Sequence, residues 1–131
     1  MEKKDFHKGQ TVWIYLVGNA ARGTKTLEER IQEWEVVSVG RKYITCRDNN
    51  CSWREAKFDI DDDFRHVYKY GTADYILYLS KEDILNEIYK NTLISNIVNT
   101  VVYNRSRIRK MSVDDLEVIN EILKRHEETL E

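Results

Sequence analysis

The chain has 131 residues, of which 41% are hydrophobic and 34% are charged, and its formal net charge is −2 at pH 7. This balance is typical of a soluble folded chain and excludes a disordered one, because the 11% of aromatic residues supply side chains for a core. The slightly acidic total also excludes a protein that binds nucleic acid by overall charge, since each phosphate contact requires a Lys or an Arg.

The first half of the chain alternates apolar and polar residues with the period of two that is typical of β-strands. This alternation predicts strands over residues 11–17, 31–39, 42–47, 53–60 and 74–79. Gly40 with Arg41, and the segment 48–50 (DNN), have the chemistry of tight turns and predict hairpins. The polar segment 18–30 is longer than a hairpin turn requires and is predicted to be a loop. Several short strands favour a closed barrel, because closure removes unpaired strand edges.

At Ser80 the apolar period changes to that of a helix. Ser80 with Asp83, and Ser112 with Asp115, have the spacing of a helix N-cap. We therefore expect two helices joined by the segment 104–111. The apolar positions of the first helix are Ile84, Leu85, Ile88, Tyr89, Leu93, Ile94, Ile97, Val98, Val101 and Val102. The seam of the second consists of Leu116, Ile119, Leu123, His126 and Leu130.

The order of these segments resembles a known family. The segments that carry the resemblance are FHKGQTVWI, GNAARG, EWEVVSVGRKYITC, KFDID and YILYLSKEDI. They resemble small β-barrel proteins of unassigned role from phages and mobile elements of Gram-positive bacteria, from residue 6 to about 90 and more loosely to the end. That family is similar to the SH3-like barrels, which include KOW and Tudor modules and which bind rather than catalyse. The resemblance implies a phage-type accessory protein and supplies no functional residues.

The predicted fold class is therefore α+β, with a small SH3-like antiparallel β-barrel over residues 1–79 and a C-terminal helical hairpin over residues 80–131. The apolar stripe of the first helix is wider than one neighbour covers, so the hairpin should pack on the barrel or in a dimer. A two-fold partner offers an identical surface, and we expect a homodimer. Its predicted contact residues are Ile94, Ile97, Val98 and Val101.

One set of residues has the pattern of a metal-dependent nuclease. Asp48 precedes Glu55-Ala56-Lys57, and such enzymes place two carboxylates and a lysine around Mg²⁺ on a strand. However, they do so on a sheet flanked by helices, and Asp48 lies where a turn favours aspartate. We expect no catalytic residues and no enzyme, and keep a Mg²⁺-dependent nuclease as the second alternative.

Two other groups could bind metal ions. The acidic cluster consists of Asp59, Asp61, Asp62 and Asp63. It lacks the glycine and the final glutamate of a calcium loop, so we expect a solvated turn. Its negative charge could also let it occupy the groove in which a host enzyme binds nucleic-acid phosphate. Cys46 and Cys51 could form a disulfide across the turn, but a reducing compartment favours free thiols. A zinc site there would need two further ligands, and His7 and His66 lie at no recognised ligand spacing. We expect no metal and no cofactor.

Basic and aromatic residues supply the remaining candidates. The segment NRSRIRK carries Arg105, Arg107, Arg109 and Lys110, either as a solubilising connection or as a contact to phosphate or to an acidic protein. The aromatic residues of the strands are Trp13, Tyr15, Trp34, Tyr43, Trp53, Phe58, Tyr68 and Tyr70, and we expect most to fill the core. Alternation makes Tyr43 and Trp53 the candidates for an exposed pair. With Arg22, Arg41 and Lys42 they should form one mixed basic and aromatic surface.

The first hypothesis is a non-catalytic phage-type accessory protein that binds a host macromolecule. We expect that partner to be a host protein of nucleic-acid metabolism or defence, which this protein would inhibit. The alternative is a module that binds nucleic acid directly. No apolar run approaches the roughly 18 residues of a membrane helix, and the opening residues MEKKDFHKGQ have no signal-peptide core. We therefore expect no membrane partner and a cytoplasmic location in a bacterial host.

Overall fold

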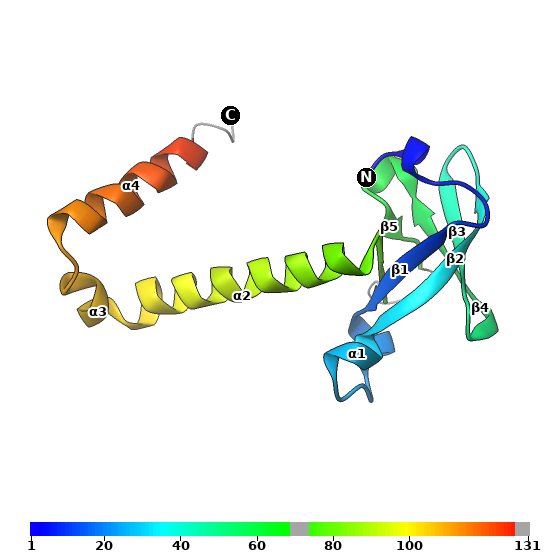
Figure 1. Cartoon of the computed structure of the whole chain (residues 1–131), viewed down its shortest axis with the longest axis horizontal. Coiled ribbons are helices and arrows are strands. Elements are labelled where there is room, and N and C mark those ends of the chain that lie inside the picture. Colours follow the sequence, from blue (N-terminus) through cyan, green and yellow to red (C-terminus); the bar gives the residue numbers. More distant parts are fainter. Residues whose placement is uncertain (69–73, 128–131) are drawn as a thin grey trace. The chain divides into compact units, whose positions relative to one another are not determined.

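The computed structural model describes residues 1–68 and 74–127, and the chain divides into two compact units, Met1–Ile88 and Tyr89–Glu131. The first unit contains a closed antiparallel β-barrel, and helices follow it in the chain (Figure 1). The predicted α+β class, a barrel and then helices, is confirmed. Tyr70 of the predicted aromatic set and Leu130 of the predicted seam lie outside the described residues.

Six strands close the barrel, and each pairs with its neighbours in chain order. They are β1 (Thr11–Leu16), β2 (Ile31–Val39), β3 (Tyr43–Asp48), β4 (Cys51–Asp59), β5 (Arg65–His66) and β6 (Tyr75–Tyr78). Closure occurs at β1, where Ile14 is paired with Gln32 of β2 and with Leu77 of β6. The five predicted strands are confirmed to within two residues at each end. β5 was missed because two residues are too short to show a period.

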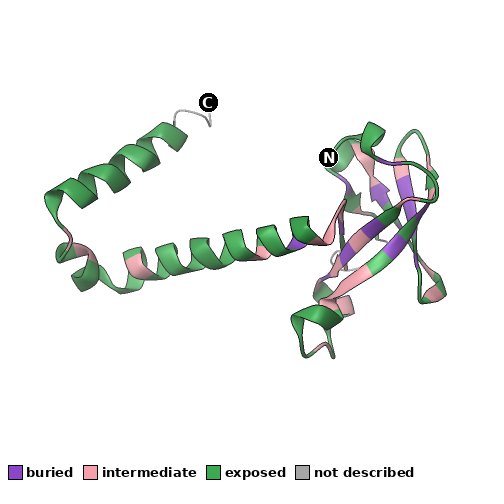
Figure 2. Ribbon diagram, in the orientation of Figure 1, coloured by how far each residue is buried: buried purple, intermediate pink, exposed green. Residues whose placement is uncertain are grey.

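The inward-facing residues of the strands form the barrel core, which is coloured purple in Figure 2. The buried hydrophobic residues of the strands are Val12, Ile14, Leu16, Trp34, Val36, Ile44, Cys46, Ala56, Phe58 and Leu77. Among the described aromatic candidates only Trp34 and Phe58 are buried, so the prediction that most of them fill the core is wrong. Trp13 and Tyr15 alternate with inward-facing Ile14 and therefore point outward.

Short helical turns connect several strands. They are η1 (Lys3–Asp5), η2 (Gly18–Ala21), α1 (Leu27–Arg30) and η3 (Ile60–Asp62). The segment 18–30, predicted to be a loop, thus contains two helical turns. The Asp74 carboxylate accepts hydrogen bonds from the backbone N–H groups of Asn19 (3.1 Å) and Ala20 (3.4 Å), and Thr26 caps α1 through the N–H of Glu29 (3.3 Å). Single turns like these leave no periodic apolar signal in a sequence.

Within the described part of the chain, three helices follow the barrel: α2 (Lys81–Tyr103), α3 (Arg105–Arg109) and α4 (Val113–Glu127). The predicted caps are confirmed, because the Ser80 hydroxyl accepts from the N–H of Asp83 and the Ser112 hydroxyl from the N–H of Asp115, each at 3.1 Å. α3 lies within the segment predicted as a plain connection. The first turns of α2 belong to the barrel unit, where Ile84 is fully buried.

The helical unit differs from the barrel because none of its described residues, from 89 to 127, is buried (Figure 2). α2 and α4 follow each other as predicted, but their apolar side chains are exposed to solvent. Within residues 1–68 and 74–127, no helix combines the length and the apolar character needed to cross a membrane.

Candidate binding groove on the barrel

A groove of about 480 Å³ runs along β5 and β6 in the barrel unit. Among the described residues that line it, five carry aromatic rings: Phe64, His66, Tyr68, Tyr75 and Tyr78. Within the described residues β5 pairs with β6 at one position, Arg65 opposite Ile76. A two-residue strand forms few ladder hydrogen bonds, so side chains rather than backbone line this part of the wall.

The rings of the groove are packed against the barrel core. His66 lies with its ring centroid 4.9 Å from that of Tyr75 and 5.9 Å from that of Tyr68. Behind them, Phe58 is 5.8 Å from His66 and Trp34 is 5.0 Å from Tyr75. Because Phe58 and Trp34 are fully buried, the central rings of the groove are held in place by the core rather than by a loop.

Hydrogen bonding and burial fix the protonation of these groups. His66 Nδ1 accepts a hydrogen bond from the N–H of Asp74 at 3.2 Å, which places the proton of the neutral ring on Nε2. Burial lowers the pKa of His66, and the nearby Asp74 carboxylate opposes that shift. Burial also raises the pKa of Tyr75 and of Tyr78, so both phenols stay protonated. At neutral pH the groove therefore presents uncharged rings.

The predicted acidic cluster reaches this groove through Asp63, which is one of the lining residues. The Asp59 carboxylate accepts from the N–H of Asp61 at 3.0 Å and caps η3, while Asp62 lies 3.9 Å from Arg65. Among the described residues, Asp61 and Asp63 have no ion-pair partner. No three His, Cys, Asp or Glu side chains in residues 1–68 and 74–127 are arranged to hold a metal ion.

The backbone places Asp63 at the groove through two consecutive left-handed residues. Asp63 has φ 54° and Phe64 has φ 56°. Aspartate tolerates this region, whereas a bulky residue does so at a cost of about 1–2 kcal/mol. Burial of Phe64 and its stacking on Phe6, with centroids 5.2 Å apart, offset that cost. Alternation along a strand could not have predicted this turn.

The predicted mixed basic and aromatic surface is not formed. In the ladder Tyr43 is opposite Asp59, and Trp53 lies six positions before Asp59, so the two rings are about 20 Å apart along the hairpin. Arg22 precedes β2, whereas Arg41 and Lys42 follow it, at the other end of a strand about 30 Å long. Alternation predicts the face of a residue correctly, but it does not give the end of the barrel at which the residue lies.

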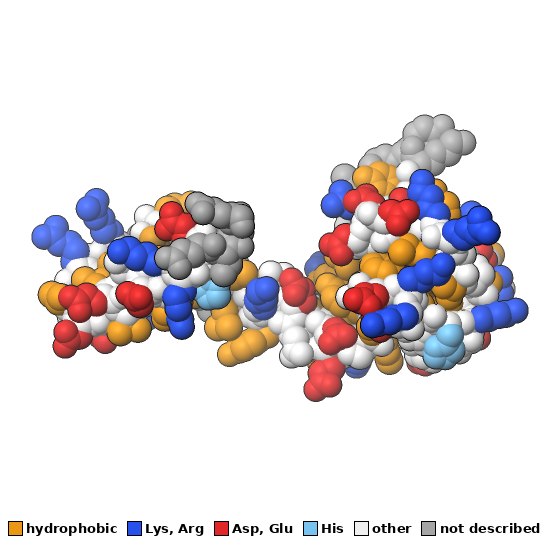
Figure 3. All heavy atoms as spheres, turned by 90° about the horizontal axis from the view of Figure 1, so that it is seen from above, with side chains coloured by type: hydrophobic (Ala, Val, Ile, Leu, Met, Phe, Trp, Pro, Cys, Tyr) orange, Lys and Arg blue, Asp and Glu red, His pale blue; other side chains and the backbone are white. Residues whose placement is uncertain are grey.

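The residues of the predicted mixed surface instead contact separate sets of neighbours. The Lys42 and Lys57 ammonium groups lie 5.4 and 5.7 Å from the centre of the Tyr43 ring. Trp53 is 79% exposed and is contacted by the Arg54 guanidinium at 5.5 Å. The Lys42 carbonyl accepts from the N–H of Ile60 at 2.8 Å, so the basic turn adjoins the acidic one. Figure 3 shows basic and acidic side chains interspersed on the barrel.

The residues of the suggested nuclease set point to different sides of the barrel wall. Asp48 is buried, lies 3.6 Å from Arg54, and accepts from the N–H of Asn50 at 2.9 Å. Glu55 is exposed on the outer face and is bonded to Arg47 at 3.1 Å. The carboxylates of Asp48 and Glu55 do not converge on a shared metal position, and Asp48 is a structural residue of the β3–β4 turn.

The cysteines are both free thiols, as predicted. Cys46 is buried in the barrel, and burial raises the pKa of its thiol to about 12. A thiol with that pKa forms almost no thiolate at neutral pH and is unreactive. Cys51 is partly exposed at the start of β4.

The basic segment of the helical unit forms α3 and its C-cap. Its cations are Arg105, Arg107, Arg109 and Lys110, and all four are exposed. Within residues 74–127 and 1–68, no carboxylate lies within ion-pair distance of any of them. These four cations are therefore available to an anionic ligand.

Comparison with known proteins connects the chain to phages. A family profile described as the Phage ProQ C-terminal-like domain matches residues 1–126. Neither the curated proteins nor the solved structures that were compared gave a match. The phage character of the resemblance in the sequence is confirmed, while its kinship with SH3-like and KOW barrels and its Gram-positive origin stay predictions. Since the match runs from the barrel through nearly all of α4, the chain belongs to the Phage ProQ C-terminal-like domain family.

Proposed function

We propose that this protein is a non-catalytic phage accessory protein whose barrel binds a host protein through the groove along β5 and β6. The observation that carries the proposal is that Asp63 lies in the same groove as five aromatic rings. A carboxylate beside aromatic faces binds a lysine or arginine side chain by charge and by cation–π attraction together. The expected ligand is a basic segment of the host protein.

The charges of the barrel favour a protein over a nucleic acid as the ligand of this groove. Arg65, the groove's arginine, lies 3.9 Å from Asp62, and Asp63 follows. Other barrel cations are also in ion pairs, among them Arg47 with Glu55 and Arg54 with Asp48. A phosphate in the groove would lie near the Asp63 carboxylate and an arginine already paired with Asp62, whereas a basic peptide would meet the complementary charge of Asp63.

A host protein of nucleic-acid metabolism or defence fits this chemistry. Such proteins present basic segments to phosphate, and an acidic, aromatic groove could occupy one of those segments in place of the nucleic acid. The expected effect on the host protein is competitive inhibition, because the same basic residues cannot bind both partners. A binding role also agrees with the use of Asp48 as a turn residue rather than as a metal ligand.

An amide NMR titration of the full chain with two short peptides tests the proposal. One peptide carries lysine, arginine and tryptophan, and the other is identical except that glutamate replaces the basic residues. We expect the basic peptide to shift the amide signals of β5 and β6. Asp63→Lys should abolish the shifts, and Tyr68→Ala should weaken them, because Tyr68 lines the groove yet is 42% exposed.

Trp53→Ala is the matched control, since Trp53 is an exposed aromatic residue that does not line the groove. Binding should be unchanged in that variant. The proposal fails if the glutamate peptide binds equally well, or if Asp63→Lys leaves the shifts intact. If single-stranded RNA binds in the groove and Asp63→Lys strengthens that binding, the ligand of the groove is a nucleic acid rather than a protein.

Direct binding of nucleic acid through α3 is the second candidate, supported by its four exposed cations. Four phosphate contacts would give a salt slope of about −3.6 on duplex DNA, which is too small for tight binding without other contacts. Replacement of Arg105, Arg107, Arg109 and Lys110 by alanine should bring that slope close to zero. The matched control replaces Lys124 and Arg125 of α4, and an equal loss there would show that charge alone, rather than α3, binds the DNA.

A further inference from the structure

The second half of α2 is an uncharged, apolar surface. Residues 91–104 contain no Asp, Glu, Lys or Arg. The aliphatic side chains on the apolar side of this stretch are between 43% and 62% exposed. They are Leu93, Ile94, Ile97, Val98, Val101 and Val102. A contiguous apolar surface of this kind on a folded chain marks a contact site.

The apolar residues of α2 form two rows. With 3.6 residues per turn, Leu93, Ile97 and Val101 follow one i, i+4 row. Ile94, Val98 and Val102 follow a second row, turned by about 100° from the first. Together the rows occupy about half of the helix circumference, and one neighbouring helix covers only one of them. The predicted dimer residues include two from each row.

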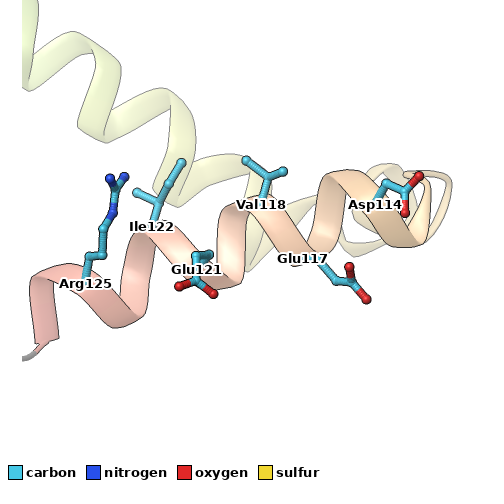
Figure 4. Close-up of a pocket in the computed structure, with 6 residues that line it drawn as sticks. All are labelled: Asp114, Glu117, Val118, Glu121, Ile122 and Arg125. Carbon is cyan, nitrogen blue, oxygen red and sulfur yellow. The ribbon is translucent and has the colours of Figure 1, made fainter.

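α4 repeats this arrangement. Leu116, Ile119 and Leu123 follow one face, and Val118 with Ile122 follow a second, about 110° away by the same geometry. All five are at least 36% exposed. Figure 4 shows Val118 and Ile122 projecting from one side of α4, with Arg125 following them on that side, and Glu117 from another side. Both apolar rows of α4 are exposed and lack a partner within the described helical unit.

We propose that α2 and α4 of one chain pair with α2 and α4 of a second copy in a four-helix bundle, which makes the protein a homodimer. In such a bundle each helix packs against two neighbours in directions roughly at right angles. α2 and α4 each carry two apolar rows that are separated by roughly such an angle. In the dimer, one row of each helix would pack between α2 and α4 of the same chain and the other row against the second copy, so that the rows exposed in the single chain are all covered.

Charge and area both favour a second copy as the occupant. The stretch 91–104 would leave any charged group of a partner buried and unpaired, but the same stretch of a second chain brings no charge. A stable interface buries about 800 Å² on each partner, which a single row of three side chains does not supply. Rows from both α2 and α4 are therefore required, and two-fold symmetry makes them self-complementary.

Light scattering coupled to size-exclusion chromatography, on the full chain at micromolar concentration, tests this inference. We expect a mass of twice 15.7 kDa for the unmodified protein. Val98→Asp and Ile122→Asp should each halve that mass, because each places a charge in one row. The tryptophan near-ultraviolet circular dichroism should stay unchanged, since Trp34 lies in the barrel core.

Asn99→Asp is the matched control, because Asn99 lies in the next position along α2 but on its polar side. It adds the same charge and should leave the dimer intact. A monomeric unmodified chain would overturn the inference. So would loss of the barrel signal in Val98→Asp, which would show that the barrel covers α2. If Ile122→Asp stays dimeric while Val98→Asp does not, the interface is an α2 pair and the four-helix bundle is wrong.

Discussion

The barrel and the helical unit contain similar kinds of side chains but use them differently. In the barrel, apolar residues at alternate positions of the strands, β5 excepted, meet at one centre and are buried. In the helical unit, apolar residues at helical spacing are exposed along α2 and α4. A closed sheet supplies its own partner for every inward face, whereas an amphipathic helix requires a second surface.

The two units also differ in what stabilises them. Serine caps and periodic apolar residues define where α2 and α4 begin, but isolated helices of this length gain little stability from such local terms. The barrel gains its stability from burial of apolar area in its core. The barrel should therefore fold within one chain, and the helices should become stable only through a partner surface.

The largest expected effect lies in the barrel core. Phe58→Ala should lower the free energy of unfolding by about 3–5 kcal/mol, because Phe58 is fully buried and its loss leaves a cavity. Urea denaturation followed by tryptophan fluorescence measures the change. Trp53→Ala, at an exposed position, should change it by no more than about 0.5 kcal/mol. If Ile97→Ala in α2 lowers the same transition as much as Phe58→Ala, the two units unfold together and the contrast fails.

The next effect lies at the β3–β4 turn. Asp48→Ala should destabilise the barrel by about 1–3 kcal/mol, since it leaves the N–H of Asn50 and the Arg54 guanidinium without their partner. The same urea titration measures it. Asp61→Ala is the control, because the Asp61 side chain is exposed and has no ion-pair partner among the described residues. Equal losses in the two variants would mean that the buried position of Asp48 adds nothing.

Most of the barrel could be predicted because strand alternation reports which face is buried. Ile44, Cys46 and Phe58 show this directly, since all three lie inside as their spacing requires. The groove could not be predicted in the same way. It depends on β5, which is two residues long, and on the left-handed turn at Asp63 and Phe64, and neither leaves a periodic pattern.

In the helical unit, too, some features could be predicted from the sequence and others could not. The caps at Ser80 and Ser112 were predicted because a serine and an aspartate at fixed spacing satisfy free N–H groups locally. α3 was missed, since its five residues contain a single apolar side chain, Ile108, and show no period. Local hydrogen bonds can be read from a sequence, whereas contacts between distant segments depend on the fold.

Replacing the N-cap serine of α4 and that of α2 should show how far each helix depends on its cap. Ser112→Ala should cost α4 about 1 kcal/mol, because the N–H of Asp115 loses its acceptor and no described residue of α4 is buried. Ser80→Ala should reduce helicity less, since buried Ile84 and the Lys81–Glu28 ion pair at 3.7 Å also hold the start of α2. Circular dichroism at 222 nm through a thermal melt measures both. Equal loss of helicity would show that the barrel does not support α2.

The smallest expected effect is a pH dependence that arises in the barrel alone. Burial lowers the pKa of His66 below its ordinary value of 6.5, although Asp74 opposes the shift. As pH falls below about 6.5, the unfolded chain therefore binds a proton at this position before the folded chain does. The free energy of unfolding should fall with pH from about 6.5 down through the lowered folded pKa, and it should be constant above that window.

His66→Asn isolates this effect, because the asparagine oxygen can accept from the N–H of Asp74 in place of Nδ1 but does not titrate. Urea midpoints at about pH 7.5 and pH 5 should differ less in His66→Asn than in the unmodified protein. His7→Asn is the control, since His7 is exposed at the N-terminal end and should leave the difference unchanged. If the two variants behave alike, the acid sensitivity comes from carboxylates rather than from the groove. A reduced difference in His66→Asn alone would instead place the titrating group among the aromatic rings that line the proposed binding site.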